Sequence, residues 1–524
     1  MTNGRRVGFA ALVPSILAVT MVVVPLDDRP VTAQLPRLLG AIAGVQVAEP
    51  PRPLLGRYLT PGNAPGIAAW LRESAPRDAR AYVISADMMV YGGLVASRVP
   101  GVTRGDAYTR LRDLAAFRAT RPDASFAVFG TVMRLAPTGV PASGAAAHWP
   151  FAGADVWGAI QQYAGLPDPP VTPDDRAKAQ RIRDRLGPVL DAYLATRARN
   201  RDVDLFALRL AAEGAFDRVV LGQDDAGPVG LHLDDLAALR RFAAQWTPPS
   251  RASIEPGADE LAMALLAQAL ARDAAFVPSV RVIYSRPDGA SVNDPLEFSP
   301  IAGTIGDLIR TCGARAARPG ERGDVDLFVQ VPATGAADEA QFVDAIARDP
   351  SRAAVADLTF LATEDYPQQR ALTDALAARG VAGSVAAFAS WNTVANTVGT
   401  ALPEAIAALA GRRTGRYDAR AHATFTLMRY VDDIAFHTAV RPALNAGLNA
   451  DGVPDHTYLT PAVAARTEAA DRAALWPLGL ALLEKIAPQF RDGGFTITLP
   501  WDRTFETELD LRLQAAPTAA GRAR

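Results

Sequence analysis

Pairs of adjacent aspartates follow two of the apolar, strand-like segments of this chain. Asp27 and Asp28 come directly after the first such segment and are followed by Arg29. Asp224 and Asp225 come after a later one. Hydrolysis of a glycosidic bond needs two carboxyl groups, one protonated and one ionised. We therefore predict that one member of the second pair is the general acid. One member of the first pair would be the base, the nucleophile or a substrate-orienting group.

Other polar and aromatic side chains lie at or just after the ends of further strand-like segments. Carboxylate, amide and guanidinium groups orient polar ligands in pockets, and aromatic rings can stack on sugar rings. We assign these residues as candidate substrate-binding groups. They are Arg29, Asp87, Tyr91, Arg134, Gln223, His232, Glu255, Trp391, Asn392 and Asn396.

Each of these residues also has a structural explanation. An aspartate after a strand is often only the N-cap of the next helix. This explains Asp259 well, because an apolar helical segment, 260–270, follows it. Trp391 is explained equally well as core packing. Capping does not require doubled aspartates or an adjacent arginine, however, so we favour a shared polar pocket for the set as a whole.

No metal ligand is assigned, because the five histidines form no HxxxH or HExxH pattern. Clustered aspartates with His232 could still hold a divalent metal, which is the second hypothesis for the site. Asp433 and His437 would share one face of an α-helix, a spacing that suits a metal pair. We favour a solvated helix face or an ion pair there.

The elements that position these residues follow from hydrophobic patterning. Near-continuous apolar segments alternate with amphipathic helices, which predicts parallel strands covered on both faces. The carboxyl ends of such strands share one edge, where ligands bind. We predict an α/β fold, a TIM-like (β/α) barrel with extra units, and two Rossmann-like doubly wound domains as the alternative. The ten predicted strands are 21–26, 45–50, 81–87, 125–132, 218–225, 251–256, 280–285, 325–331, 353–360 and 383–391.

The predicted domain organisation is one large α/β unit with additions. The catalytic-like unit spans 21–400 and contains a helical insert at about 137–215. A mainly helical C-terminal region with a final strand covers 401–513, and 514–524 form a disordered tail. Residues 1–20 are an N-terminal extension or a signal-like segment.

Composition excludes several classes of function. The formal charge of −2 gives no basic field for nucleic-acid binding. The single cysteine, Cys312, rules out an internal disulfide and a thiolate zinc site. Residues 7–26 carry no charge, but their second half is better explained as the first strand, so no stable membrane span is predicted. We predict a cytoplasmic protein, with export through the signal-like segment as the alternative.

Seven segments together carry a resemblance to a known family. They are VVPLDDRPVTAQLP, LLGRYLTPGN, ISADMMVYGGLVASR, LGQDDAGPVGLH, PGADELAMALLAQAL, SWNTVANTVGTAL and LPWDRTFETEL. In combination they resemble the bacterial family known as domain of unknown function 4127, from about residue 21 to 513. The resemblance implies one large catalytic-like unit beginning near Met21, and it implies no particular activity.

Three hypotheses of function follow. The first is a glycoside hydrolase-like enzyme that acts on a small carbohydrate substrate without a cofactor. The second is a divalent-metal-dependent hydrolase. The third is a non-catalytic binder of sugars or other solutes. The oligomeric state is not predicted.

Overall fold

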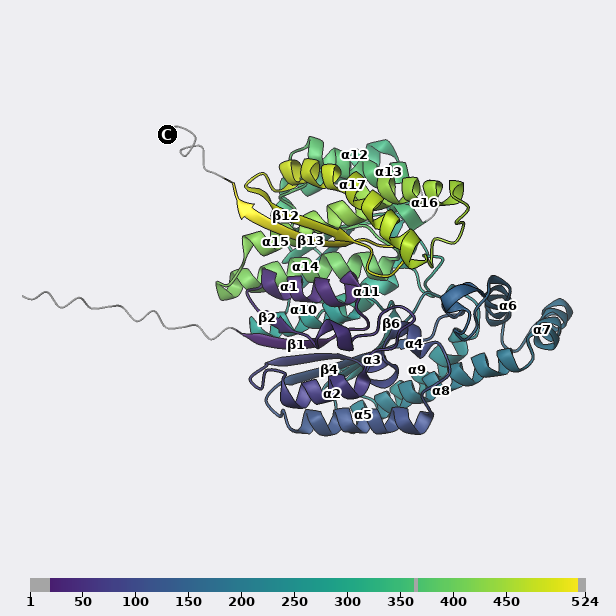
Figure 1. Cartoon of the computed structure of the whole chain (residues 1–524). Helices are drawn as coiled ribbons and strands as arrows, with labels where there is room; N and C mark the ends of the chain where they lie inside the picture. The colour runs from purple at the N-terminus through teal and green to yellow at the C-terminus, as the bar shows by residue number, and fades with distance from the viewer. Residues whose placement is uncertain (1–18, 362–365, 517–524) are drawn as a thin grey trace, which may run out of the picture.

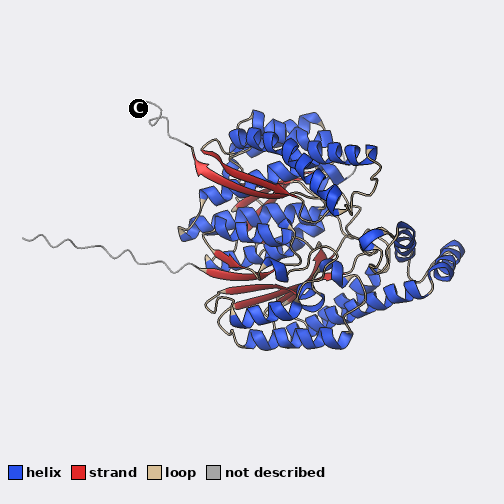
Figure 2. Cartoon of the chain, in the orientation of Figure 1, coloured by secondary structure: helices blue, strands red, loops and turns tan. Residues whose placement is uncertain are grey.

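The structure is a computed structural model that describes residues 19–361 and 366–516. Its core contains two parallel β-sheets with helices between and around them (Figures 1 and 2). The first sheet has six strands in the order β2-β1-β3-β4-β5-β6. These are β1 (Thr20–Val24), β2 (Gln46–Ala48), β3 (Ala81–Ser85), β4 (Ser125–Val132), β5 (Arg218–Gln223) and β6 (Ala252–Pro256).

The second sheet has five strands in the order β11-β10-β9-β7-β8. In each sheet the first strand in sequence lies between the second and the third, so both sheets have an open, doubly wound order. The strands are β7 (Ser279–Tyr284), β8 (Arg315–Ala316), β9 (Val325–Gln330), β10 (Ala353–Asp357) and β11 (Ala387–Ala389).

The predicted barrel is wrong, because the described residues form two open sheets and no closed barrel. All ten predicted strand segments do form strands, and only the two-residue β8 was not predicted in this part of the chain. Alternating strands and helices are common to barrels and open sheets. The two architectures differ only in which strands pair, and local hydrophobic patterning does not specify the pairing.

Both faces of the first sheet are buried, as predicted for parallel strands. Val22 and Val24 of β1 face one apolar cluster, whereas Met21 and Val23 face the other. The helices of the first cluster include α2 (Ala64–Glu73), α3 (Ala86–Tyr91), α5 (Arg104–Ala119), α8 (Pro188–Ala212) and α9 (His232–Trp246).

A layer of helices between the two sheets joins them into one body (Figure 1). The most extensive helix–helix contact there is between α10 and α14. The layer contains α1 (Leu35–Ile42), α10 (Leu261–Asp273), α11 (Ile301–Thr311) and α14 (Val394–Thr414). The second sheet also packs against α12 (Ala336–Arg348) and α13 (Tyr366–Ala378).

The predicted helical insert, 137–215, contains α6 (Ala154–Ala164), α7 (Pro173–Leu186) and the whole of α8. Helices α6 and α7 project from the side of the first sheet (Figure 1). Shorter helical segments are η1 (Pro30–Gln34), η2 (Arg52–Leu54), α4 (Leu94–Ser97), η3 (Gly144–Ala146), η4 (Gly289–Ser291), η5 (Pro350–Arg352) and η6 (Thr359–Leu361).

The C-terminal region consists of helices and one antiparallel hairpin. Its helices after α14 are α15 (Ala419–Arg429), the π-helix η7 (Tyr430–Val440), α16 (Arg441–Ala450) and α17 (Pro461–Ile486). The predicted final strand is a hairpin, β12 (Phe490–Thr498) and β13 (Glu508–Ala515). Strand β13 extends past 513, so the predicted tail starts too early.

The predicted signal-like segment and the end of the tail fall on residues 1–18 and 517–524, outside the described residues. Within 19–361 and 366–516, no helix is both long enough and apolar enough to cross a membrane.

Candidate active site

A cavity of about 210 Å³ lies at the carboxyl ends of the first sheet, where they meet the start of α14 and the turn between β12 and β13. We call it the first cavity. It brings together residues that are hundreds of positions apart in sequence. The predicted site residues that line it are Arg29, Arg134, Gln223, Asp224, Asp225, Asn392 and Asn396. Lining residues that were not predicted include Arg98, Asp259, Glu297, Trp501, Arg503 and Phe505.

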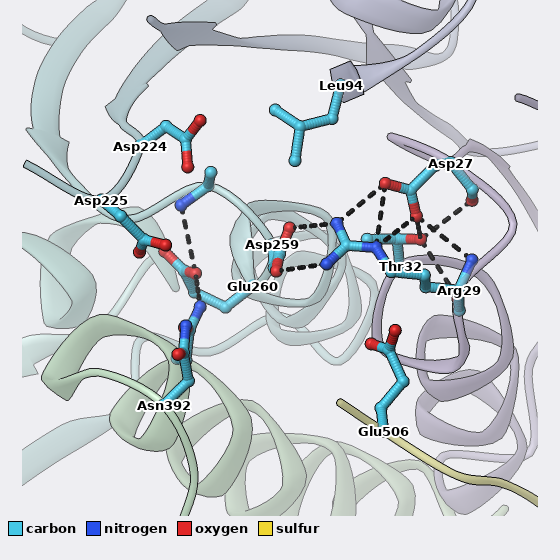
Figure 3. A network of polar contacts seen from close by, with 12 residues as sticks. Asp27, Arg29, Thr32, Leu94, Asp224, Asp225, Asp259, Glu260, Asn392 and Glu506 are labelled. Carbon is cyan, nitrogen blue, oxygen red and sulfur yellow. Dashed lines mark hydrogen bonds and ion pairs between the residues drawn. The ribbon is translucent and has the colours of Figure 1, made fainter. Parts of the chain in front are cut away.

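Arg29 lies between two carboxylates (Figure 3). Its Nη1 and Nη2 donate to Oδ2 and Oδ1 of Asp259 at 2.9 and 2.6 Å, a bidentate ion pair. On its other side, Nη2 donates to Oδ2 of Asp27 at 2.8 Å. Asp27 also accepts a bond from the Thr32 hydroxyl at 2.7 Å. Asp27 is buried outside the first cavity, and its contacts orient Arg29 rather than a ligand.

Asp28 has a similar supporting position. Its Oδ1 accepts a hydrogen bond from Nε1 of Trp501 at 2.7 Å, and Arg52 lies 3.4 Å from Oδ2. Burial raises the pKa of Asp28 above its usual value. The Trp501 ring lines the first cavity, with the guanidinium carbons of Arg29 and Arg503 at 4.8 and 4.5 Å from its centroid. The first aspartate pair therefore positions Arg29 and Trp501, and neither of its members lines the first cavity.

The second aspartate pair lines the first cavity, and its two members differ in environment. Asp224 is buried and accepts bonds from Nε and Nη2 of Arg98 at 3.1 and 2.5 Å. The Asp225 side chain is one-third exposed, and its nearest cationic atom is Nη1 of Arg134 at 3.7 Å. Burial, together with the negative charge of Asp224, raises the pKa of Asp225 to about 6. Glu297 lines the same cavity with a pKa raised to about 8, but it is buried, so Asp225 is the more exposed of the two carboxyl groups with a raised pKa.

Asp259 does not cap helix α10 as predicted. The N-cap of α10 is Glu260, which makes no side-chain capping bond. A close approach between backbones holds the Asp259 loop in place. A Cβ at Gly222 on β5 would lie 2.0 Å from the carbonyl oxygen of Gly257, so only glycine permits this contact. The loop therefore packs against β5, and Asp259 reaches Arg29.

Two asparagines connect the first cavity with a buried acid. Asn392 has a φ of 56°, in the left-handed region that asparagine tolerates better than most residues. Its Nδ2 donates to Oδ1 of Asn396 at 2.6 Å, and Nδ2 of Asn396 donates to Oε2 of Glu260 at 2.7 Å. Burial raises the pKa of Glu260 well above its usual value. These two hydrogen bonds, from Asn392 to Asn396 and from Asn396 to Glu260, fix the amide groups that face the cavity.

Besides Asp27, Asp28 and Trp391, four predicted site residues lie outside the first cavity. Asp87 is buried and accepts the backbone N–H of Thr131 at 2.9 Å. Tyr91 and His232 are also buried, and burial lowers the pKa of His232 to about 4. Glu255 is buried with a pKa raised to about 7 by burial. These four side chains line neither the first cavity nor the larger cavity beside it, which is described below.

Replacing Asp87 with asparagine measures how much the buried carboxyl group lowers the free energy of unfolding when it is ionised. Burial raises the pKa of Asp87 to about 7. The folded state therefore binds more protons than the unfolded state between the usual pKa and 7, and the Asp87 contribution to stability falls as pH rises through that interval. We expect the unfolding free energy of Asp87→Asn, relative to the unmodified protein, to increase from about pH 5 to about pH 8. This difference in unfolding free energy should rise by at most about 1.4 kcal/mol per pH unit.

Thermal unfolding at several pH values measures this difference. The control is the exposed Asp78→Asn, for which we expect no pH-dependent gain. A stability difference for Asp87→Asn that does not change with pH would contradict the expectation.

A second cavity, of about 380 Å³, adjoins the first. Leu296, Asn392 and Phe505 line both. Trp391 lines the second cavity, and its Nε1 donates to the Thr400 hydroxyl at 3.1 Å. Trp391 is thus both packed and part of a cavity wall.

The residues that sequence reasoning missed do have a sequence signal. Arg98, Asp259, Trp501 and Arg503 all fall within segments that carry the family resemblance. Their partners could not be assigned, because the pairs they form span long separations. Arg98 and Asp224, for example, are 126 residues apart.

The described residues contain no group of three or more histidine, cysteine, aspartate or glutamate side chains arranged to hold a metal ion. The divalent-metal hypothesis is thus left to experiment.

Comparison with known proteins identifies a family but no characterised relative. Neither a curated protein nor a solved structure matched this chain. A family model described as "Protein of unknown function (DUF4127)" matches residues 21–510, most of the chain, and the seven segments that suggested this family lie within that range. The chain therefore belongs to the DUF4127 family.

Proposed function

We propose that this protein is a hydrolase of the glycoside hydrolase type, with Asp225 as general acid and Asp259 as the second carboxyl group. The observation that carries the proposal is the contrast between these two groups in one cavity. Asp225 has a pKa raised to about 6, whereas Asp259 accepts two bonds from Arg29. Two carboxyl groups that share a cavity but differ in their charged partners are a typical arrangement for acid–base catalysis.

In this proposal Asp225 donates its proton to the oxygen of the leaving group. Asp259 acts as base or nucleophile, with its negative charge held by Arg29. Burial raises the pKa of Asp259, and the bonds from Arg29 oppose that shift. Asp259 takes the role first predicted for Asp27 or Asp28, because Asp259 lines the first cavity and neither of those two groups does.

The remaining lining residues favour a carbohydrate substrate. Asn392, Asn396 and Gln223 present amides, which can bind hydroxyl groups as donors and as acceptors. Trp501 and Phe505 also line this cavity, and the guanidinium carbon of Arg503 lies 4.5 and 4.9 Å from the centroids of their rings. The proposal includes a cytoplasmic location, with export through the N-terminal segment as the alternative that cell fractionation would distinguish.

The test is turnover of a panel of glycosyl fluorides, aryl glycosides and disaccharides by the purified protein, with products identified by NMR. We expect hydrolysis of at least one member that persists in the presence of EDTA. Loss of activity in EDTA, with recovery on adding Mg²⁺, Mn²⁺ or Zn²⁺, would instead support the metal-dependent hydrolase. Thermal stabilisation by a sugar without any turnover would support the non-catalytic binder. The absence of both turnover and binding would refute the carbohydrate assignment.

A further inference from the structure

The second cavity contains two polar groups that the proposed mechanism does not use. Asp432 and His437 both line it, and both belong to the π-helix η7. A π-helix bonds residue i to residue i+5, so residues five apart share a face. This brings Asp432, rather than the predicted Asp433, next to His437. Asp433 instead accepts bonds from the Ser390 backbone N–H and from Arg429.

Asp432 and His437 are close to each other but not bonded. Oδ1 of Asp432 lies 4.0 Å from Nε2 of His437, which is too long for a hydrogen bond. This oxygen is buried and accepts no hydrogen bond of normal geometry among the described residues, and the backbone N–H of Thr507 is the nearby donor that stabilises the charged Asp432 side chain. The other oxygen, Oδ2, accepts a bond from Nη2 of Arg429 at 3.1 Å. A buried carboxylate oxygen without a partner is costly unless a ligand or water satisfies it.

The orientation of His437 determines what the cavity offers a ligand. Nη1 of Arg441 lies 3.3 Å from Nδ1 of His437. A guanidinium only donates, so Nδ1 accepts and the imidazole proton lies on Nε2. Burial and the nearby arginines lower the pKa of His437 to about 3, which keeps the ring neutral. The cavity therefore presents one N–H donor and one carboxylate acceptor, 4.0 Å apart.

A hydroxyl group satisfies both atoms, because it can accept from the Nε2–H and donate to Oδ1 at the same time. The walls around this pair include the aromatic rings of Trp391 and Phe505. Guanidinium groups of Arg441 and Arg503 lie over the Phe505 ring, so the Trp391 ring is the surface for contact with a ring-shaped ligand. Asn392 and Phe505 also line the first cavity, so one ligand can extend across both.

We infer that the second cavity is a subsite for a second hydroxylated ring, bound through a hydroxyl group held between Asp432 and His437. This inference rests on the proposed function and narrows its substrate class to compounds of at least two sugar-like units. The bond to be cleaved would lie at the junction of the cavities, near Asn392 and Phe505.

The test compares a disaccharide with a glycosyl fluoride, whose small leaving group needs no second cavity. We expect His437→Phe to lower the ratio of kcat/KM for the disaccharide to kcat/KM for the fluoride by about three- to tenfold, the value of one neutral hydrogen bond. The exposed His148→Phe is the matched control and should leave the ratio unchanged. An unchanged ratio for His437→Phe would overturn the subsite.

Two further measurements separate the subsite from the proposed function. If the unmodified protein hydrolyses nothing, the proposed function fails, whereas disaccharide-dependent thermal stabilisation that is lost in His437→Phe still supports the subsite. If His437→Phe does not fold, deoxy-disaccharides are tested on the unmodified protein. Removal of one hydroxyl from the second ring should then weaken binding at least about tenfold. Equal binding of every deoxy analogue would refute the subsite.

Discussion

Asp225→Asn is expected to lower kcat for hydrolysis by about 10²- to 10⁴-fold, because asparagine cannot donate a proton to the leaving group. The fold should tolerate the change. The Asp225 side chain is one-third exposed, and its ion-pair partner, Arg134, is 3.7 Å away. Steady-state kinetics with a substrate found in the panel, together with thermal unfolding, measure both quantities.

The pH profile adds a signature that a merely structural role would not produce. The pKa of Asp225 is raised to about 6, so the group is protonated below that value and ionised above it. As a general acid it requires the protonated form, and kcat/KM should fall about tenfold per unit as pH rises above about 6. Asp225→Asn should lose this limb. The exposed Asp510→Asn on β13 is the matched control and should keep the unmodified profile. Retention of the limb by Asp225→Asn would exclude it as the acid.

Arg29→Met is expected to destabilise the protein by about 3–5 kcal/mol, because it leaves two carboxylates without their cation. Asp27 and Asp259 both bind the Arg29 guanidinium, at 2.8 and 2.6 Å, and the three side chains are almost completely removed from solvent. Methionine fills much of the same volume as arginine. The decrease in unfolding free energy therefore comes from the two unpaired carboxylates and not from an empty space in the core. Urea unfolding of the variant and of the unmodified protein gives the difference.

The matched control is Arg512→Met, which breaks the exposed ion pair with Asp510 on β13. Exposed pairs contribute little, so we expect a loss below about 1 kcal/mol. Arg29→Lys should also be destabilised, since an ammonium group cannot make the bidentate contact with Asp259 while bonding Asp27. A loss of less than about 1 kcal/mol for Arg29→Met would show that the Asp27–Arg29–Asp259 network does not stabilise the fold.

Local patterning was enough to locate the strands. Residues such as Val22 to Val24 are apolar without alternation, which indicates a strand buried on both faces, and β1 is buried on both faces. The same patterning did not distinguish a barrel from two open sheets. Strand order depends on contacts between β1 and β3, or β7 and β9, across intervening helices, and no short segment encodes them.

The location of a polar cavity at the carboxyl ends of the first sheet was also predictable, because parallel strands bring their ends to one edge. Asp224, Asp225 and Asn392 are found there. The roles of the first pair were not predictable. Asp27 and Asp28 look the same in sequence as the second pair, but Arg29 and Trp501 occupy their oxygens. Trp501 is 473 residues away from Asp28.

Periodicity thus determined where strands, helices and the polar strand ends lie, because those features depend on neighbours a few residues apart. Tertiary structure alone decided which carboxyl groups face the cavity, since burial and the choice of partner depend on distant segments. It also decided the geometry of η7. The α-helical spacing predicted Asp433 beside His437, whereas the π-helix places Asp432 there. The extra residue in each turn changes which side chains share a face.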